Sequence, residues 1–184
     1  DVFGELSGAG GPAEVHGRAW MDHQWGDFIS VGAGGWDWFS LQLDDGRDFT
    51  ASVVRGEEGR IVLEYATFVS ADGVALHLEA GEFEIEALDE WLSTATGAVY
   101  PSRWRLVIPD EAIDLELRPA LADQELDARA STGNIYWEGA VLAVGEEGAR
   151  GRGYVELTGY VPTATALSLD ILTGPRADLC SGLP

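Results

Sequence analysis

The chain has 184 residues, a length that suits one domain able to bury a core without disulfide bonds. Its 32 acidic and 11 basic residues give a formal net charge of −21, and every basic residue is an arginine. Such a surface repels polyanions, and no run of about eighteen apolar residues occurs, so we expect neither a nucleic-acid partner nor a membrane span. The absence of lysine indicates either adaptation to high salt or a coding bias toward arginine. The single cysteine, Cys180, excludes an internal disulfide bond.

The first residues predict a separate entry segment. Glycines between Gly4 and Gly11 indicate a mobile stretch, and we expect residues 1–15 to precede one domain over residues 16–184. The chain starts at Asp1 with neither a methionine nor a signal peptide. We expect this of a mature form, a trimmed form or a piece of a longer protein.

Residues 20–25, which follow the entry segment, are interpreted as one strand. Alternation along a strand then turns Met21, His23 and Trp25 to one face. An imidazole flanked by an aromatic ring and a thioether could bind an alkene and give or take a proton. The alternative is a buried histidine that is hydrogen-bonded for structural reasons.

The next strand, over residues 36–43, carries a change in its alternation. Trp36 and Trp38 share one face, whereas Phe39 and Leu41 share the other. A β-bulge shifts the phase of a strand and is common beside functional sites. We therefore predict a bulge near Trp38.

Later segments alternate apolar and charged residues with a period of two, the pattern of half-buried antiparallel strands. The clearest are residues 82–87, 104–108, 113–118 and 154–158. Turn signals separate the strands at Asp45-Gly46, Glu58-Gly59, Asp72-Gly73, Ala80-Gly81, Gly97 with Pro101, Pro109-Asp110 and residues 145–148. We expect about nine or ten strands in an all-β antiparallel barrel or sandwich, with at most a short helix over 162–170.

Two acids lie among aromatic residues and are candidate proton donors. Asp37 stands between two tryptophans, and Glu138 follows Tyr136 and Trp137. Carboxyl groups set against apolar surface have raised pKa values unless they are paired. The alternative for each acid is a salt bridge, for which the candidate partners are Arg18, Arg103 and Arg105.

The aromatic residues of these segments predict the wall of a cavity. We expect the ligand to contact Met21, Trp25, Trp36, Trp38, Tyr136 and Tyr154, with His23, Asp37 and Glu138 in catalytic roles. The alternative is an ordinary β core, which draws on the same aromatic residues. Tyr154 belongs to a polar row along residues 154–160 that is either a solvated edge or the far wall of this cavity. Residues 123–126 are interpreted as a polar strand end at the surface.

Other chemistries lack their sequence signatures. The three histidines have no spacing typical of a zinc site, and there is no phosphate-binding loop, dinucleotide fingerprint or nucleophile elbow. We therefore expect no metal and no cofactor.

Six motifs occur in order along the chain: AWMDHQWG (residues 19–26), GWDWFSLQLDDG (35–46), YPSRW (100–104), DQEL (123–126), YWEGA (136–140) and GYVELTGY (153–160). Together they resemble the C-terminal half of the AttH-like, carotenoid 1,2-hydratase (hydroxyneurosporene synthase) family. The resemblance implies a lipocalin-like antiparallel β-barrel. It also implies that the partner of this domain is a missing N-terminal lipocalin-like domain. The ligand cavity would then lie in one of the two domains or between them.

The resemblance bears on function residue by residue. The hydratase branch of the family leads us to expect a histidine and a tryptophan, which His23 and Trp25 match. It also leads us to expect a tyrosine and an aspartate on the strand over residues 47–54, where Thr50 and Ser52 stand instead. This departure puts carotenoid hydration in doubt.

The leading hypothesis is a cavity for an apolar isoprenoid- or polyketide-like ligand, with acid-assisted alkene hydration or cyclisation if the protein is an enzyme. A periplasmic or extracellular location is expected. The first alternative is a non-enzymatic secreted ligand-binding or export-associated protein. The second is a domain whose Trp-rich face docks its missing partner domain.

Overall fold

The described residues of the protein, seen in a computed structural model, are 2–23, 34–146 and 148–161. The chain divides into two compact units, residues 1–30 and 31–184. Every strand pairing in the described ranges is antiparallel, and the only helical elements there are two single turns of 3-10 helix, Glu57–Gly59 and Pro109–Glu111. The predicted all-β class is therefore confirmed.

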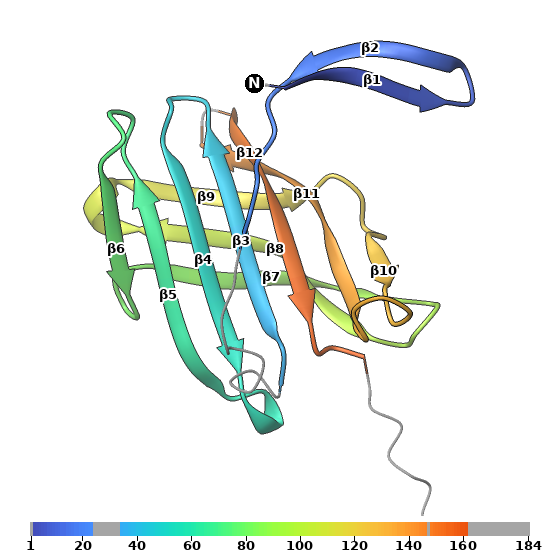
Figure 1. The fold of residues 1–184 in the computed structure, drawn as a ribbon. Coiled ribbons are helices and arrows are strands. Elements are labelled where there is room, and N and C mark those ends of the chain that lie inside the picture. The colour runs from blue at the N-terminus through green and yellow to red at the C-terminus, as the bar shows by residue number, and fades with distance from the viewer. Residues whose placement is uncertain (1, 24–33, 147, 162–184) are drawn as a thin grey trace, which may run out of the picture. The chain divides into compact units, whose positions relative to one another are not determined.

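The first unit contains a two-stranded hairpin of β1 (Val2–Gly8) and β2 (Gly11–Gly17) (Figure 1). The glycine-rich segment predicted to be a mobile entry forms paired strands. Residues 18–23 have no regular secondary structure, so the strand predicted over 20–25 is missing from its described part. The predicted domain boundary between residues 15 and 16 stays a prediction.

The second unit holds a ten-stranded sheet in the order β6-β5-β4-β3-β12-β11-β9-β8-β7, with β10 paired to β11. The strands are β3 (Trp36–Leu43), β4 (Asp48–Arg55), β5 (Ile61–Val69), β6 (Ala75–Glu79), β7 (Glu84–Leu92), β8 (Val99–Ile108), β9 (Ile113–Pro119), β10 (Glu125–Asp127), β11 (Ile135–Gly145) and β12 (Gly148–Thr158). The sheet curls into a half-barrel in which β7, β8 and β9 cross behind β3 to β6, as Figure 1 shows.

Aromatic and aliphatic side chains fill the space between these two layers. Phe39 of β3 meets Trp104 of β8 edge to face, with ring centroids 5.7 Å apart. Trp104 meets Trp137 of β11 in the same manner at 5.9 Å. Leu41 and Leu117 are fully buried in the same cluster. Trp137, from an aromatic segment assigned to a cavity wall, is therefore a core residue.

The strand β3 has no bulge near Trp38, contrary to the prediction. Its register with β4 and with β12 runs without a break from Asp37 to Gln42. Register shifts occur between Val54 and Arg55 and between Ala143 and Val144. The strand carries large apolar side chains on both of its faces, so the change of alternation requires no extra residue.

The predicted turns fall between consecutive strands or at the two 3-10 turns, except that Pro101, predicted to belong to the turn at Gly97, lies within β8. Gly46 and Gly97 have φ angles of 89° and 74°, which a glycine adopts without the steric cost of a Cβ atom. No helix among the described residues has the length and apolar character needed to cross a bilayer. The short helix allowed over residues 162–170 lies outside the described residues.

Candidate functional site

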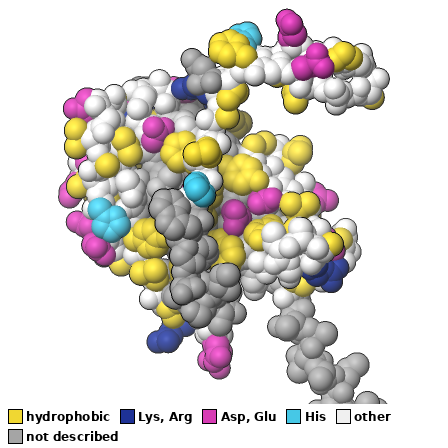
Figure 2. All heavy atoms as spheres, in the orientation of Figure 1, with side chains coloured by type: hydrophobic (Ala, Val, Ile, Leu, Met, Phe, Trp, Pro, Cys, Tyr) yellow, Lys and Arg dark blue, Asp and Glu magenta, His cyan; other side chains and the backbone are white. Residues whose placement is uncertain are grey.

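One face of the sheet gathers the predicted aromatic residues with two carboxylates. We call it the outer face: the side of β3, β4, β5, β10, β11 and β12 turned away from the core. Trp36 and Trp38 of β3 lie on it because their neighbours Phe39 and Leu41 point into the core. Glu138 of β11 lies on it because Trp137 is buried on the core side. Figure 2 shows acidic side chains among hydrophobic ones on this face.

Strand register places the two acids beside a tryptophan. Glu138 is directly opposite Glu156, Glu156 is opposite Trp38, and Trp38 is opposite Ser52. These four residues, which we call the acid row, run across β11, β12, β3 and β4. Directly opposed residues on one face of a sheet have Cβ atoms about 5 Å apart. Two carboxylates and an indole therefore lie within reach of one small molecule.

Hydrogen bonds give the two acids different surroundings. The indole N–H of Trp36 donates a hydrogen bond to a carboxylate oxygen of Glu156 at 2.8 Å. Burial raises the pKa of Glu138 above its ordinary value, and a hydrogen bond from the Tyr154 hydroxyl partly opposes this rise. Both carboxylates are half-buried, so solvent still reaches them. The face thus offers a carboxyl group suited to donate a proton beside one suited to accept it.

Asp37 does not belong to this face. It points to the core side of β3, where Arg55 of β4 forms an ion pair with it and the Tyr160 hydroxyl lies 2.9 and 3.0 Å from its two carboxylate oxygens. Only 15% of the Asp37 side chain and 11% of the Arg55 side chain are exposed. The predicted alternative of a salt bridge is therefore present, but with Arg55 in place of Arg18, Arg103 or Arg105.

A second polar cluster lies on the core side at β10. Glu125 accepts hydrogen bonds from Ser93 at 2.6 Å, Thr96 at 2.7 Å and Tyr100 at 2.8 Å. The ring of Tyr100 lies 5.3 Å from that of Tyr160. The surface interpretation of residues 123–126 is thus wrong for Glu125, because its carboxylate ties β10 to the loop between β7 and β8.

The sequence did not predict that four residues of these two clusters act together: Arg55, Tyr160, Tyr100 and Glu125. Tyr100, Glu125 and Tyr160 do occur in the motifs YPSRW, DQEL and GYVELTGY, so the motifs held a signal. The contacts that reveal their role join residues 18 to 123 positions apart in the chain. These contacts show that one residue from each of the three motifs stabilises the fold.

The predicted catalytic histidine lies in the first unit. His23 and Met21 are exposed there, while Trp25 lies outside the described residues. The predicted meeting of His23 with Trp36 or Trp38 stays a prediction.

Thr50 and Ser52 stand where the hydratase resemblance led us to expect a tyrosine and an aspartate. Both lie on the outer face, since Thr50 is opposite Ser40 and Ser52 is opposite Trp38. Of the two positions expected to carry a proton donor, Ser52 is therefore part of the acid row and Thr50 lies beside it. In this chain they offer hydroxyl groups only.

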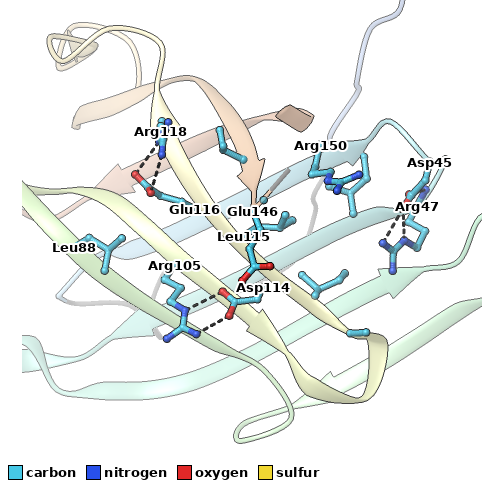
Figure 3. A pocket seen from close by; sticks show the side chains of 15 residues that line it. Asp45, Arg47, Leu88, Arg105, Asp114, Leu115, Glu116, Arg118, Glu146 and Arg150 are labelled. Atoms are coloured by element: carbon cyan, nitrogen blue, oxygen red, sulfur yellow. Dashed lines mark hydrogen bonds and ion pairs between the residues drawn. The ribbon is translucent and has the colours of Figure 1, made fainter. Parts of the chain in front are cut away.

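A hollow of about 860 Å³ opens elsewhere on the second unit, between β9 and the β3–β4 and β11–β12 turns. Figure 3 shows three of its arginines, Arg47, Arg105 and Arg118, turned toward neighbouring carboxylates. Arg105 binds Asp114 through two hydrogen bonds of 2.9 and 2.6 Å, and Arg118 binds Glu116 through two of 2.9 and 3.0 Å. These guanidinium groups are engaged within the chain, so we assign them to surface ion pairing.

Within the described part of the chain, no group of three or more His, Cys, Asp or Glu side chains is arranged to hold a metal ion.

The curled antiparallel sheet defines a lipocalin-like domain. The chain belongs to the AttH-like family, whose sequence profile matches residues 1–160. A crystal structure assigned as AttH from Nitrosomonas europaea is similar to 87% of this chain, with 37% sequence identity and a TM-score of 0.78. A crystal structure of kievitone hydratase from Nectria haematococca is similar to 85% of this chain, with 23% identity and a TM-score of 0.68.

The chain spans 49% of the length of each of these two solved proteins. No curated protein matches the sequence. The lipocalin-like fold and the family predicted from the six motifs are confirmed.

Proposed function

We propose that the outer face binds an apolar, unsaturated small molecule of isoprenoid or polyketide type, and that Glu138 protonates it. One observation carries this proposal: a half-buried carboxyl group with a raised pKa lies on the same sheet face as Trp36 and Trp38. Tryptophan rings supply flat apolar contact area at little entropic cost. The name of the similar hydratase structure supports addition of water as the reaction class.

The chemistry needs an acid and a base on one face. Glu138 transfers its proton to one carbon of the double bond, and the indole faces stabilise the cation that forms on the other carbon. Water attacks that cation while Glu156 takes the proton that the water loses. Proton exchange with solvent then restores both carboxyl groups. The sum is an alkene plus water giving an alcohol, with no change in redox state.

The alternative function is ligand binding without a reaction. It is favoured by the hydroxyl residues Thr50 and Ser52 at the positions where the hydratase branch is expected to carry a proton donor. A periplasmic or extracellular location and a partner lipocalin-like domain belong to both alternatives as proposals. The partner domain is supported by the chain spanning about half of its solved relatives.

Binding is tested with all-trans-retinol, a fluorescent polyene alcohol, added to the full chain. Trp36→Ala and Trp38→Ala should each weaken binding about tenfold or more, because each removes most of a large aromatic contact. Leu142→Ala is the matched control, since Leu142 lies on the same face of β11 but outside the acid row and is 50% exposed. Equal losses for all three variants would contradict binding at the aromatic residues.

Catalysis is tested separately with Glu138→Gln. Mass spectrometry should detect the addition of one water to a polyene by the wild-type protein, and the variant should lose at least about a hundredfold in rate while retaining retinol affinity. A variant that hydrates at the wild-type rate would refute the donor role. A wild-type protein that binds retinol but hydrates no polyene would establish the binding alternative.

A further inference from the structure

A row of apolar side chains crosses the outer face beside the acid row. Register joins Leu63 of β5 to Val54 of β4, and Val54 to Trp36 of β3. On the other side, Leu126 of β10 is opposite Tyr136 of β11. We call these five residues the apolar row.

Thr158 of β12 connects the two halves of the apolar row. It is opposite Tyr136, and its hydroxyl oxygen accepts a hydrogen bond from the backbone N–H of Trp36 at 3.0 Å. The Thr158 side chain is buried and so presents no polar obstacle at the surface. The row is therefore continuous from β5 to β10.

The two ends of the row are its most exposed members. Leu63 is 45% exposed and Leu126 is 47% exposed, whereas Val54, Trp36 and Tyr136 between them are half-buried. Adjacent strands lie about 4.8 Å apart, so the five steps from β5 to β10 make the row about 24 Å long. An exposed leucine at each end of a half-buried aromatic strip leaves apolar area that a ligand can cover.

The row is long and is bounded on one side by the acid row, of which Trp38 alone is apolar. The acid row lies two residues further along the strands, so the carboxylates of Glu156 and Glu138 bound one of its sides. A stable protein partner needs about 800 Å² on each side, with charged residues depleted at the centre. A narrow apolar strip next to carboxylates fits an elongated small molecule better than a second protein.

We propose that Leu63 and Leu126 determine the length of the ligand that the outer face prefers. The ligand is an elongated apolar molecule that lies across the strands, with its chain on the apolar row and one unsaturated bond beside Glu138. The proposal rests on the proposed function and adds the orientation of the ligand and two specificity-determining residues.

The test uses geraniol, farnesol and geranylgeraniol, which share a head group and lengthen by one isoprene unit at a time. Affinity for the full chain, measured by calorimetry, should rise from the shortest to the longest alcohol. Leu63→Ala and Leu126→Ala should each weaken binding of geranylgeraniol about fivefold or more, because each removes apolar contact at one end of the ligand. Geraniol is too short to reach both ends, so at least one of the two substitutions should leave its affinity unchanged.

Leu142→Ala is again the control, and it should leave all three affinities unchanged. Thermal melts check that each variant is folded, as expected for substitutions at exposed positions. Affinity that does not depend on chain length, or equal losses for Leu63→Ala and Leu142→Ala, would overturn the length proposal while leaving binding at Trp36 intact. A Trp36→Ala variant that binds all three alcohols like the wild type would instead overturn the proposed function.

Sedimentation of the wild type and Leu63→Ala at several concentrations distinguishes a protein occupant. A dimer that dissociates on Leu63→Ala would show that the apolar row is an interface between copies, and the ligand proposal would fail. A monomer in both cases is the result that we expect.

Discussion

Arg55 and Asp37 form a buried ion pair that joins β4 to β3 on the core side of the sheet. Arg55 also donates to the backbone carbonyl oxygen of Thr158 and lies 4.2 Å from the ring centroid of Tyr160. One guanidinium group therefore holds β3, β4 and the end of β12 together. Because Trp36 and Glu156 project from the same strands on the opposite face, this pair supports the geometry of the candidate site.

Replacing Arg55 by Met should strongly destabilise the protein. The variant keeps most of the side-chain volume but leaves the Asp37 carboxylate buried without its partner. Breaking a buried pair in this way costs about 3 to 5 kcal/mol. Urea unfolding followed by tryptophan fluorescence measures the loss.

Arg105→Met is the matched control for that measurement. Arg105 is paired with Asp114 at the surface, where both side chains are more than half exposed. Its loss should barely move the unfolding midpoint, since exposed ion pairs add little to stability. Equal shifts for the two variants would show that the buried ion pair of Asp37 contributes no more to stability than the exposed pair of Asp114.

Gly35→Ala should also destabilise the fold, through the backbone. Gly35 has a φ of 94°, and a Cβ atom placed on it would lie 2.3 Å from the carbonyl oxygen of Thr158. Gly133 has a similar φ of 82° but open space around it, so Gly133→Ala carries only the left-handed strain of about 1 kcal/mol. Thermal melts should show a clearly larger loss at Gly35, and similar losses would mean that the close approach relaxes without cost.

Alternation of residues predicted the strands well because it is a local property. The segments over 104–108 and 113–118 lie within β8 and β9 as expected. The same rule failed at Trp38, because alternation assumes one buried face and β3 uses both of its faces. Because Trp36 and Trp38 are large apolar residues on the outer face, the sequence pattern looked as if the alternation had shifted by one residue.

The composition of the site was less predictable from sequence than the fold. The prediction joined Asp37 and Glu138 in one site, but neighbouring positions on a strand face opposite ways, and Asp37 adjoins Trp38. Its partner Tyr160 is 123 residues away in the chain. Only strand order and register reveal such a contact, and neither can be read from local pattern.

Glu138→Gln should stabilise the protein at neutral pH. The folded-state pKa of Glu138 is raised by burial, so its stabilising contribution is present below its unfolded pKa and is lost as the pH rises through the folded value. The amide removes this charge and can still accept the hydrogen bond from Tyr154. The gain at pH 7 should stay below about 1 kcal/mol, since solvent screens a partly exposed carboxylate.

The Glu138 experiment compares melting temperatures of wild type and variant from pH 7 to pH 4. The advantage of the variant should shrink as the pH falls toward the ordinary pKa of a glutamate. Glu90→Gln, at an exposed position on β7, measures how much stability is gained by removing one negative charge from the acidic surface. Repeating the melts in 1 M salt screens this general charge repulsion. A variant that is less stable than wild type at pH 7 would show that the ionised carboxylate is favoured.

Raising the salt concentration should stabilise the protein as a whole. A net charge of −21 repels itself more strongly in the folded state than in the expanded chain, and unfolding relieves this repulsion. Like charges also face each other directly, as Glu5 and Glu14 do on β1 and β2 and Glu138 and Glu156 do on the outer face.

The Debye length falls to about 10 Å at 0.1 M salt and about 3 Å at 1 M, so screening predicts most of the gain below about 0.5 M. A specific adaptation to high salt predicts a rise in melting temperature that continues to about 3 M, and melts at pH 7 in sodium and potassium chloride separate the two. A melting temperature that stays flat or falls over this range would show that the acidic surface does not limit stability, and would leave coding bias as the explanation for the absence of lysine.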